Sequence, residues 1–227
     1  MERIIKNFYH HPIISRIFHT LVYCLKRELK DCNSVLDLGC GPDSPIKYCG
    51  VKYSVGVDAF RPYIEESKKK KIHNKYILGD ITKVDFEPKS FDAVIMIDVL
   101  EHLEKEQGRK LLEKAEKWAR KKIIVSTPNG FLPGEDSNPL QSHRSGWEIE
   151  EMRNYGYMAY GLAGWKFLRK RNAPENINKE EFFTIRLRPK PFGVIISVLS
   201  QILTYHFPKL AFEVFYVKNL IESNETE

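Results

Sequence analysis

The fold class of this chain is decided at residues 35–42, which read Val35-Leu36-Asp37-Leu38-Gly39-Cys40-Gly41-Pro42. The apolar run predicts a buried strand, and an acid and two glycines stand at its end. Glycine lets the backbone turn sharply and approach a ligand closely, and the Asp37 carboxylate can accept hydrogen bonds from a cationic or hydroxylated ligand. The dinucleotide pattern Gly-x-Gly-x-x-Gly needs a third glycine at position 44, where this chain has Ser44, so that pattern is incomplete.

Acids also stand at the ends of the next three predicted strands. Asp58 ends the second strand, Asp80 follows the third within Gly79-Asp80-Ile81, and Asp98 ends the fourth. The carboxyl ends of parallel strands share one edge of a sheet, where ligands bind, and an acid about twenty residues after the glycine turn can hold both hydroxyls of a ribose. One such acid is commonly a cap or turn residue, whereas four in succession predict a ligand site.

Strand-like and helix-like segments alternate from Ser34 to Tyr155. Such alternation predicts crossover connections and an α/β fold of the Rossmann-like, doubly wound kind. We expect a mostly parallel seven-stranded sheet, an N-terminal helix, and a helical insertion before the last strand. The expected strands are residues 34–38, 53–57, 76–78, 91–97, 123–126, 157–162 and 211–217. The expected helices are one amphipathic helix from Ile14 to about Lys30, a helical stretch through Glu65 and Glu66, residues 104–120, residues 145–155 from the capping-box spacing of Ser145 and Glu148, and residues 192–207.

Length and composition indicate one domain. The 227 residues are 42% hydrophobic, which suffices for one core and is too short for two full domains. We divide residues 1–227 into an N-terminal helical extension (1–33), a core (34–163), a variable insertion or lid (164–210) and a last strand (211–218). The stretch from Lys166 to Lys179 is basic and polar.

Charge and cysteine content restrict the partners and the compartment. The net charge of +6 mildly favours acidic partners such as nucleic acid or anionic lipid. No cysteine pair has Cys-x-x-Cys spacing, which favours reduced thiols. Because no segment resembles a signal peptide or comfortably spans a bilayer, we expect a soluble cytoplasmic protein, with peripheral membrane contact as an alternative.

Taken together, the strand-end motifs resemble a class I S-adenosylmethionine (SAM)-dependent methyltransferase. The resemblance is to the broad type 11 group with a Val-Leu-Glu-His-Leu segment after the fourth strand, here Asp98-Val99-Leu100-Glu101-His102-Leu103. It covers about residues 35–156. It implies SAM as the cofactor and S-adenosylhomocysteine (SAH) as the product, and it says little about the acceptor.

The resemblance also implies roles for individual residues. The turn from Asp37 to Gly41 would wrap the methionine part of SAM, Asp58 would hold the ribose, and Asp80 would take the adenine amino group. Asp98 would lie near the sulfonium. Many relatives have a third glycine at position 43, where this chain has Asp43, which puts a contact from that position in doubt. The implied cofactor-binding residues are Asp37, Gly39, Cys40, Gly41, Asp58, Ala59, Asp80, Ile81 and Asp98.

Two histidines are candidate catalytic bases, since imidazole titrates near neutral pH. His102 follows the fourth predicted strand, and His143 lies in the loop after the fifth. For both, packing or helix capping is the alternative interpretation, and the other histidines have no comparable context. We expect no metal site, because the strand-end carboxylates are spread over different strands without a local ligand repeat.

The acceptor is left open among several classes. The leading hypothesis is methyl transfer to oxygen or nitrogen of a small-molecule or lipid-linked acceptor, with the apolar helix at 192–207 as a core helix, a lid or an interfacial helix. An RNA-modifying methyltransferase that uses the basic surface is an alternative. A non-catalytic binding protein on a methyltransferase scaffold is another, disfavoured by the intact acids. A nicotinamide oxidoreductase comes last because the third glycine is missing.

Overall fold

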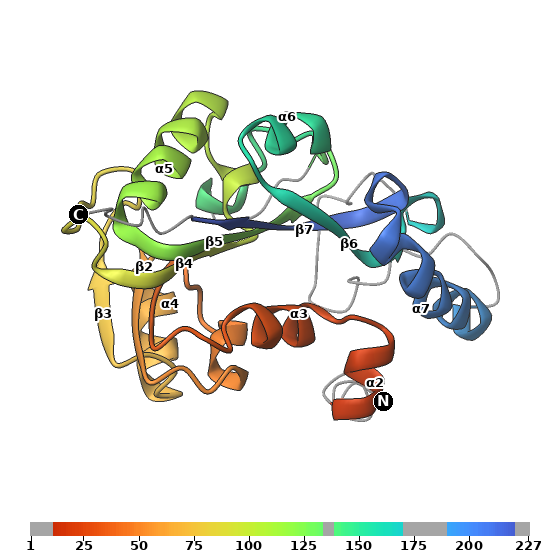
Figure 1. Cartoon of the computed structure of the whole chain (residues 1–227), viewed down its shortest axis with the longest axis horizontal. Helices are drawn as coiled ribbons and strands as arrows, with labels where there is room; N and C mark the ends of the chain where they lie inside the picture. Colours follow the sequence, from red (N-terminus) through yellow and green to blue (C-terminus); the bar gives the residue numbers. More distant parts are fainter. Residues whose placement is uncertain (1–10, 134–138, 170–189, 221–227) are drawn as a thin grey trace, which may run out of the picture.

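A seven-stranded mixed sheet forms the centre of the structure, a computed structural model that describes residues 11–133, 139–169 and 190–220 (Figure 1). The strand order is β3-β2-β1-β4-β5-β7-β6, and β7 runs antiparallel to both of its neighbours. The expected mostly parallel, seven-stranded sheet is confirmed. The strands are β1 Ser34–Leu38, β2 Tyr53–Asp58, β3 Lys75–Leu78, β4 Phe91–Ile97, β5 Ala119–Pro128, β6 Met158–Trp165 and β7 Ala211–Asn219.

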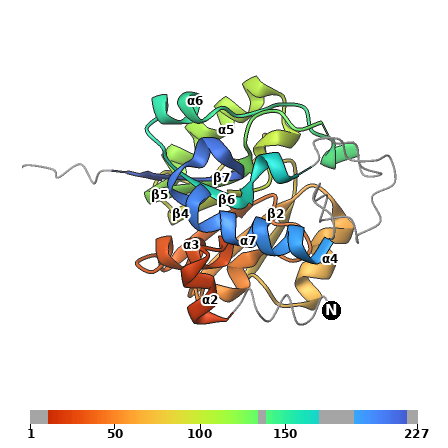
Figure 2. The same ribbon diagram turned by 90° about the vertical axis from the view of Figure 1, so that its right-hand side faces the viewer.

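Helices cover both faces of this sheet, as a doubly wound fold requires. In Figure 1, α5 and α6 lie on one face and α2, α3 and α4 on the other, and Figure 2 shows α7 on the side of α2 and α3. The helices are α2 Pro12–Ile17, α3 Leu21–Glu28, α4 Arg61–Lys69, α5 Lys105–Trp118, α6 Ile149–Asn154 and α7 Lys190–His206.

Strands β1, β4, β5 and β7 each contribute to two separate cores, because successive side chains point to opposite faces. Leu36 and Val94 pack with α5 and α6, whereas their neighbours Val35 and Ala93 pack with α3. Burial on both faces explains the nearly continuous apolar sequence of β4. The sheet is therefore a rigid platform whose carboxyl edge carries the acids.

The N-terminal region differs from the single helix expected over residues 14–30. It forms two helices, α2 and α3, that are separated at His19, where φ is 45°. Thr20 begins the second helix, because its side chain accepts a hydrogen bond from the amide of Tyr23 at 3.3 Å. The apolar spacing continues across this break, so periodicity alone could not locate it.

The capping box expected at Ser145 and Glu148 does not form. Helix α6 begins at Ile149 after Glu148, which makes no side-chain cap hydrogen bond. The Ser145 hydroxyl instead donates to the carbonyl of Leu100 at 3.0 Å and accepts from the indole of Trp147 at 3.1 Å. The Ser145 hydroxyl, which the spacing predicted to cap the helix, therefore makes tertiary hydrogen bonds instead.

Helix α7 docks on the edge strand β6 through its polar side. The Gln201 side chain accepts from the amide of Gly164 at 2.6 Å and donates to the carbonyl of Gly161 at 3.0 Å, and Ser200 accepts from the amide of Trp165 at 2.9 Å. These bonds satisfy backbone groups of an edge strand that has no further strand beside it. The apolar side of α7 faces outward in consequence.

The basic stretch from Lys166 to Lys179 lies largely outside the described residues, which resume at residue 190. Within the described ranges, no helix combines the length and the hydrophobicity that a membrane crossing needs.

The four cysteines are free thiols, and their surroundings predict low reactivity. Burial raises the pKa of Cys32 to about 11 and that of Cys24 and Cys49 to about 12, and it also raises the pKa of Cys40. Because the thiolate is the nucleophile, we expect alkylation by iodoacetamide at pH 8 to be about 100-fold slower than in 6 M guanidinium chloride. Mass spectrometry of timed samples measures this, and rapid labelling of any cysteine in the folded protein would contradict the described packing.

Candidate cofactor and acceptor site

A pocket of about 280 Å³ opens at the carboxyl edge of the sheet, where the strand-end acids were expected to meet. Its volume is near the lower end of the range for small-molecule sites. Seven of the nine predicted cofactor-binding residues line it. The lining residues are Gly39, Gly41, Asp58, Ala59, Asp80, Ile81, Thr82, Asp98, Val99, His102, Leu103, Gln107, Leu140, Gln141 and Arg144.

Asp58 at the end of β2 organises this pocket. One carboxylate oxygen accepts from the amide of Gly41 at 2.9 Å and the other from the amide of Phe60 at 2.8 Å. The side chain is 8% exposed, and burial raises its pKa, although the amides of Phe60 and Gly41 oppose that shift. A carboxylate has about four acceptor positions, so Asp58 can bind these amides and still accept from the hydroxyls of a ribose.

The backbone of the glycine turn closely approaches a neighbouring residue, as its sequence implied. Gly39 has a φ of 67°, and an added Cβ would lie 2.6 Å from Cγ2 of Val99, so the backbone comes against the opposite wall of the pocket. Gly41 has a φ of 56° and open space around it. The turn therefore leaves backbone accessible to a ligand in the pocket.

Asp37 and Cys40, in contrast, lie behind the pocket. Asp37 is 2% exposed, and its carboxylate accepts from the hydroxyl of Ser44 at 2.5 Å and lies 3.5 Å from Nε2 of His73. Burial and the charge of Asp58 raise the pKa of Asp37 to about 7, with Ser44 opposing them. Ser44 thus holds the turn from below, which accounts for a serine at the position of the third glycine.

Asp43 also turns away from the pocket. Its carboxylate accepts from the ammonium groups of Lys47 at 2.5 Å and Lys70 at 3.0 Å. Asp80 lines the pocket, with one oxygen accepting from the amide and hydroxyl of Thr82 at 2.9 and 2.7 Å. Burial acts to raise the pKa of Asp80, but these hydrogen bonds lower it overall.

Three carboxyl groups gather where β4, β5 and β7 meet. The amide of Asp98 donates to the carbonyl of Ser126 at 2.9 Å, and the hydroxyl of the same serine donates to Glu213. Asp98 has a φ of 54°. It lines the pocket and is exposed to solvent there. Burial and then the charges of Glu213 and Glu101 raise the pKa of Asp98, and burial likewise raises the pKa of Glu213.

Glu213 was not among the predicted site residues, because it stands near the start of a strand and the prediction considered strand ends. Since β7 is antiparallel, its beginning lies at the carboxyl edge of its neighbours, and Glu213 pairs in register with Pro128 at the end of β5. The only warning in the sequence is one acid within the otherwise apolar segment Ala211–Val217.

A second pocket of about 300 Å³ lies beside Glu213, between the turn after α2, strands β6 and β7, and helix α7. It was not expected from the sequence. Arg169 lies over the ring of Phe212, 4.8 Å from its centre, and lowers the pKa of Glu213 against the effect of burial. The lining residues are Phe18, His19, Thr20, Leu21, Val22, Leu162, Ala163, Gly164, Arg169, Ser197, Gln201, Phe212 and Glu213.

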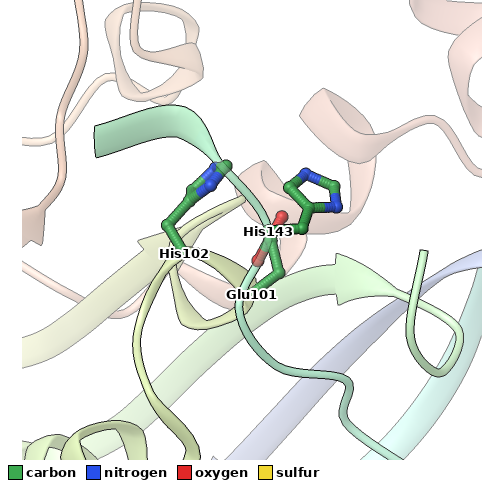
Figure 3. A group of neighbouring side chains, drawn as sticks. All are labelled: Glu101, His102 and His143. Carbon is green, nitrogen blue, oxygen red and sulfur yellow. The ribbon is translucent and has the colours of Figure 1, made fainter. Parts of the chain in front are cut away.

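The two predicted histidines meet near the first pocket, with their ring centres 5.0 Å apart. His102 lines that pocket, whereas His143 is not one of its lining residues. Figure 3 shows both imidazoles beside the buried Glu101. Glu101 accepts from the hydroxyl of Thr127 at 2.9 Å, and burial raises its pKa to about 8. This group of side chains contains the residue types of a metal site, although the sequence pattern gave no sign of one.

Comparison with known proteins finds similarity to methyltransferases. Residues 36–124 match a family model described as a methyltransferase domain. (S)-Coclaurine N-methyltransferase from Thalictrum flavum subsp. glaucum is 32% identical over 111 residues, which are 44% of this chain and 29% of that enzyme. The chain spans less than a third of the length of such curated relatives.

Two solved structures share the fold. A SAM-dependent methyltransferase from Archaeoglobus fulgidus superposes with a TM-score of 0.53 at 18% identity, covering 92% of this chain and 98% of that one. The plantazolicin methyltransferase BpumL in complex with SAH gives 0.51 at 17% identity, covering 96% and 90%.

The sheet order, the acids around the pocket and the domain match define the class of this chain: it carries a class I, SAM-dependent methyltransferase domain.

Proposed function

We propose that this protein transfers the methyl group of SAM to the nitrogen of a small-molecule amine that carries an apolar portion. The proposal rests on the carboxylates Asp98 and Glu213, which lie on either side of Ser126 between the two pockets. Neighbouring carboxylates that the protein partly removes from water are costly unless they are paired with cations. Arg169 is the nearby cation that acts on Glu213, so the cluster of three carboxyl groups favours a positively charged acceptor.

The first pocket is assigned to the cofactor and the second to the acceptor. Asp58 is proposed to hold the ribose, Asp80 the adenine amino group, and the Gly39–Gly41 turn the methionine portion, with Ala59 and Ile81 beside the ring. Asp37 and Cys40 support that turn from behind instead of touching the ligand, a modification of their expected role.

The acids would perform two tasks at the acceptor nitrogen. SAM supplies a methyl group on a positively charged sulfur, and its displacement needs a nitrogen lone pair. Asp98 and Glu213 bind the ammonium form by accepting its N–H groups, and a carboxylate oxygen then takes the proton that must leave. Fixing the nitrogen in line with the methyl group contributes the orientation that lowers the barrier.

The apolar portion of the acceptor follows from the walls of the second pocket and from α7. Phe18 and Phe212 line the pocket, and α7 covers it with its polar side. On the outer side of the same helix, Ile195, Leu199 and Leu203 are each more than half exposed. A lipid-linked amine at a membrane surface would suit both the apolar pocket walls and the exposed apolar side of α7. The proposal therefore includes contact of α7 with a membrane surface.

A hydroxyl acceptor is the second candidate. His102 lines the cofactor pocket and is the better placed of the two predicted bases, whereas His143 supports its ring. With a hydroxyl acceptor, the imidazole would remove the proton, in place of the carboxylate that does so for an amine.

A panel of acceptors tests the proposal. The protein is incubated with isotopically labelled SAM and with matched pairs of short and long-chain amines, the corresponding alcohols, and total RNA. We expect labelled N-methyl product with the amines, in higher yield for the long chains. Labelled alcohol or RNA without labelled amine would overturn it in favour of the alternative acceptor, and no product with any class, despite SAH binding, would favour a non-catalytic scaffold.

Replacing Glu213 with glutamine is expected to lower kcat/KM for an amine acceptor about 10- to 100-fold, because the isosteric amide removes a charge-assisted hydrogen bond worth roughly 1.5–3 kcal/mol. The affinity for SAH should stay the same, since Glu213 does not line the cofactor pocket. Initial rates at varied amine concentration measure the first quantity and calorimetry the second. An unchanged kcat/KM would remove Glu213 from acceptor binding.

A further inference from the structure

Glu101, His102 and His143 converge although 40 residues separate the pair from the third member. Glu101 and His102 lie in the short 3₁₀ turn after β4, and His143 comes from the loop after β5. The amides of Arg144 and Ser145 donate to the carbonyl of Glu101 at 2.7 and 3.1 Å. This clamp fixes the loop against the turn, so the backbone of the three residues is brought together before any ligand arrives.

The donor atoms are close enough to share an ion. One atom from each side chain lies within 4.8 Å of the others, and Figure 3 shows the Glu101 carboxylate rising beside the two rings. Imidazole nitrogen and carboxylate oxygen bind a transition ion at about 2.0–2.2 Å, so two ligands of one ion are at most about 4.4 Å apart. A small side-chain rotation therefore brings the group to coordination distance.

Each of these three side chains is also hydrogen-bonded to a neighbouring group, as metal ligands in proteins commonly are. Nδ1 of His143 lies 2.6 Å from the carbonyl of Leu132, and Nδ1 of His102 lies 3.4 Å from that of Ser142. A carbonyl at Nδ1 fixes the proton there and directs the lone pair of Nε2 elsewhere. The hydroxyl of Thr127 orients the Glu101 carboxylate from behind in the same way.

We propose that Glu101, His102 and His143 form a binding site for one divalent transition-metal ion at the rim of the cofactor pocket. Two imidazoles and one carboxylate suit Zn²⁺, Mn²⁺, Fe²⁺ or Co²⁺, whereas Mg²⁺ prefers oxygen ligands alone. Three protein ligands leave coordination positions open. Because His102 lines the first pocket, those positions are available to water or to a polar group of a ligand that enters that pocket.

Titration of the metal-free protein with Co²⁺ tests the site directly. The protein is first dialysed against EDTA and then buffer, and Co²⁺ is added while visible absorption and heat are recorded. We expect one equivalent to bind with a micromolar or lower Kd and to develop visible absorption bands. Heat or absorption that does not saturate at one equivalent in the wild type would overturn the proposal.

Variants assign the ligands. His143→Ala should weaken Co²⁺ binding more than 100-fold, and Thr127→Val, which removes only the group behind Glu101, should weaken it about 10- to 100-fold. His206→Ala is the matched control, because His206 is exposed and belongs to another part of the fold. Circular dichroism shows that each variant is folded. Unchanged binding in folded His143→Ala and Thr127→Val, or an equal loss in His206→Ala, would contradict the assignment.

Discussion

Gly161→Ala is expected to destabilise the protein by about 3 kcal/mol or more, at the upper end of the cost of overpacking a core. An added Cβ at this position in β6 would overlap the carbonyl oxygen of Thr204 in α7 and would lie 2.6 Å from Cβ of Ala211. One obstacle is backbone and the other is a buried strand residue, so neither can move aside as a flexible side chain would. The expected loss corresponds to a fall in Tm of about 6–12 °C.

Gly79→Ala is the matched control for this substitution. Its added Cβ would meet Cγ1 of Val84 at 3.4 Å, which is ordinary contact, and we expect a change in stability below about 1 kcal/mol. Thermal unfolding followed by circular dichroism measures both variants. If the two variants melt at the same temperature, the close docking of α7 on β6 is wrong, and with it the walls of the second pocket.

Asp58→Ala is expected to weaken SAH binding about 30- to 150-fold. The carboxylate joins the Gly41 and Phe60 amides, and it is proposed to accept from the ribose hydroxyls as well. Losing a hydrogen-bonded charge costs about 2–3 kcal/mol, which gives that range of Kd. Asp58→Asn keeps the shape and one acceptor oxygen, so its affinity should fall between those of the wild type and the alanine variant.

The sequence was sufficient for features carried by one strand and the turn after it. The acids at Asp58, Asp80 and Asp98 were recognised because a parallel strand places its last residue at the ligand edge, and all three line the pocket. The same rule misses an antiparallel strand, whose first residues reach that edge. Glu213 was therefore missed, and so was the second pocket beside it.

Other features were hidden because tertiary contacts override local pattern. The apolar spacing from Ile14 to Leu29 predicted one helix, but the helix is interrupted at His19, where φ is 45°. The apolar segment at 192–207 left a core helix, a lid and an interfacial helix open. The side of α7 that packs on the edge strand β6 is the polar one, because Gln201 bonds that strand. The encounter of Glu101 with His143 depends on a loop clamp that no local spacing encodes.

Calorimetric titration of SAH into the wild type, Asp58→Ala and Asp43→Ala tests the central claim most directly. Asp43 is the matched control, because it belongs to the same turn but pairs with Lys47 and Lys70 outside the pocket. The account predicts micromolar binding to the wild type, a loss of about 30- to 150-fold in Asp58→Ala, and a change of less than about threefold in Asp43→Ala. Well-folded wild-type protein that does not bind SAH, or equal affinities for wild type and Asp58→Ala, would contradict the assignment of this pocket to the cofactor.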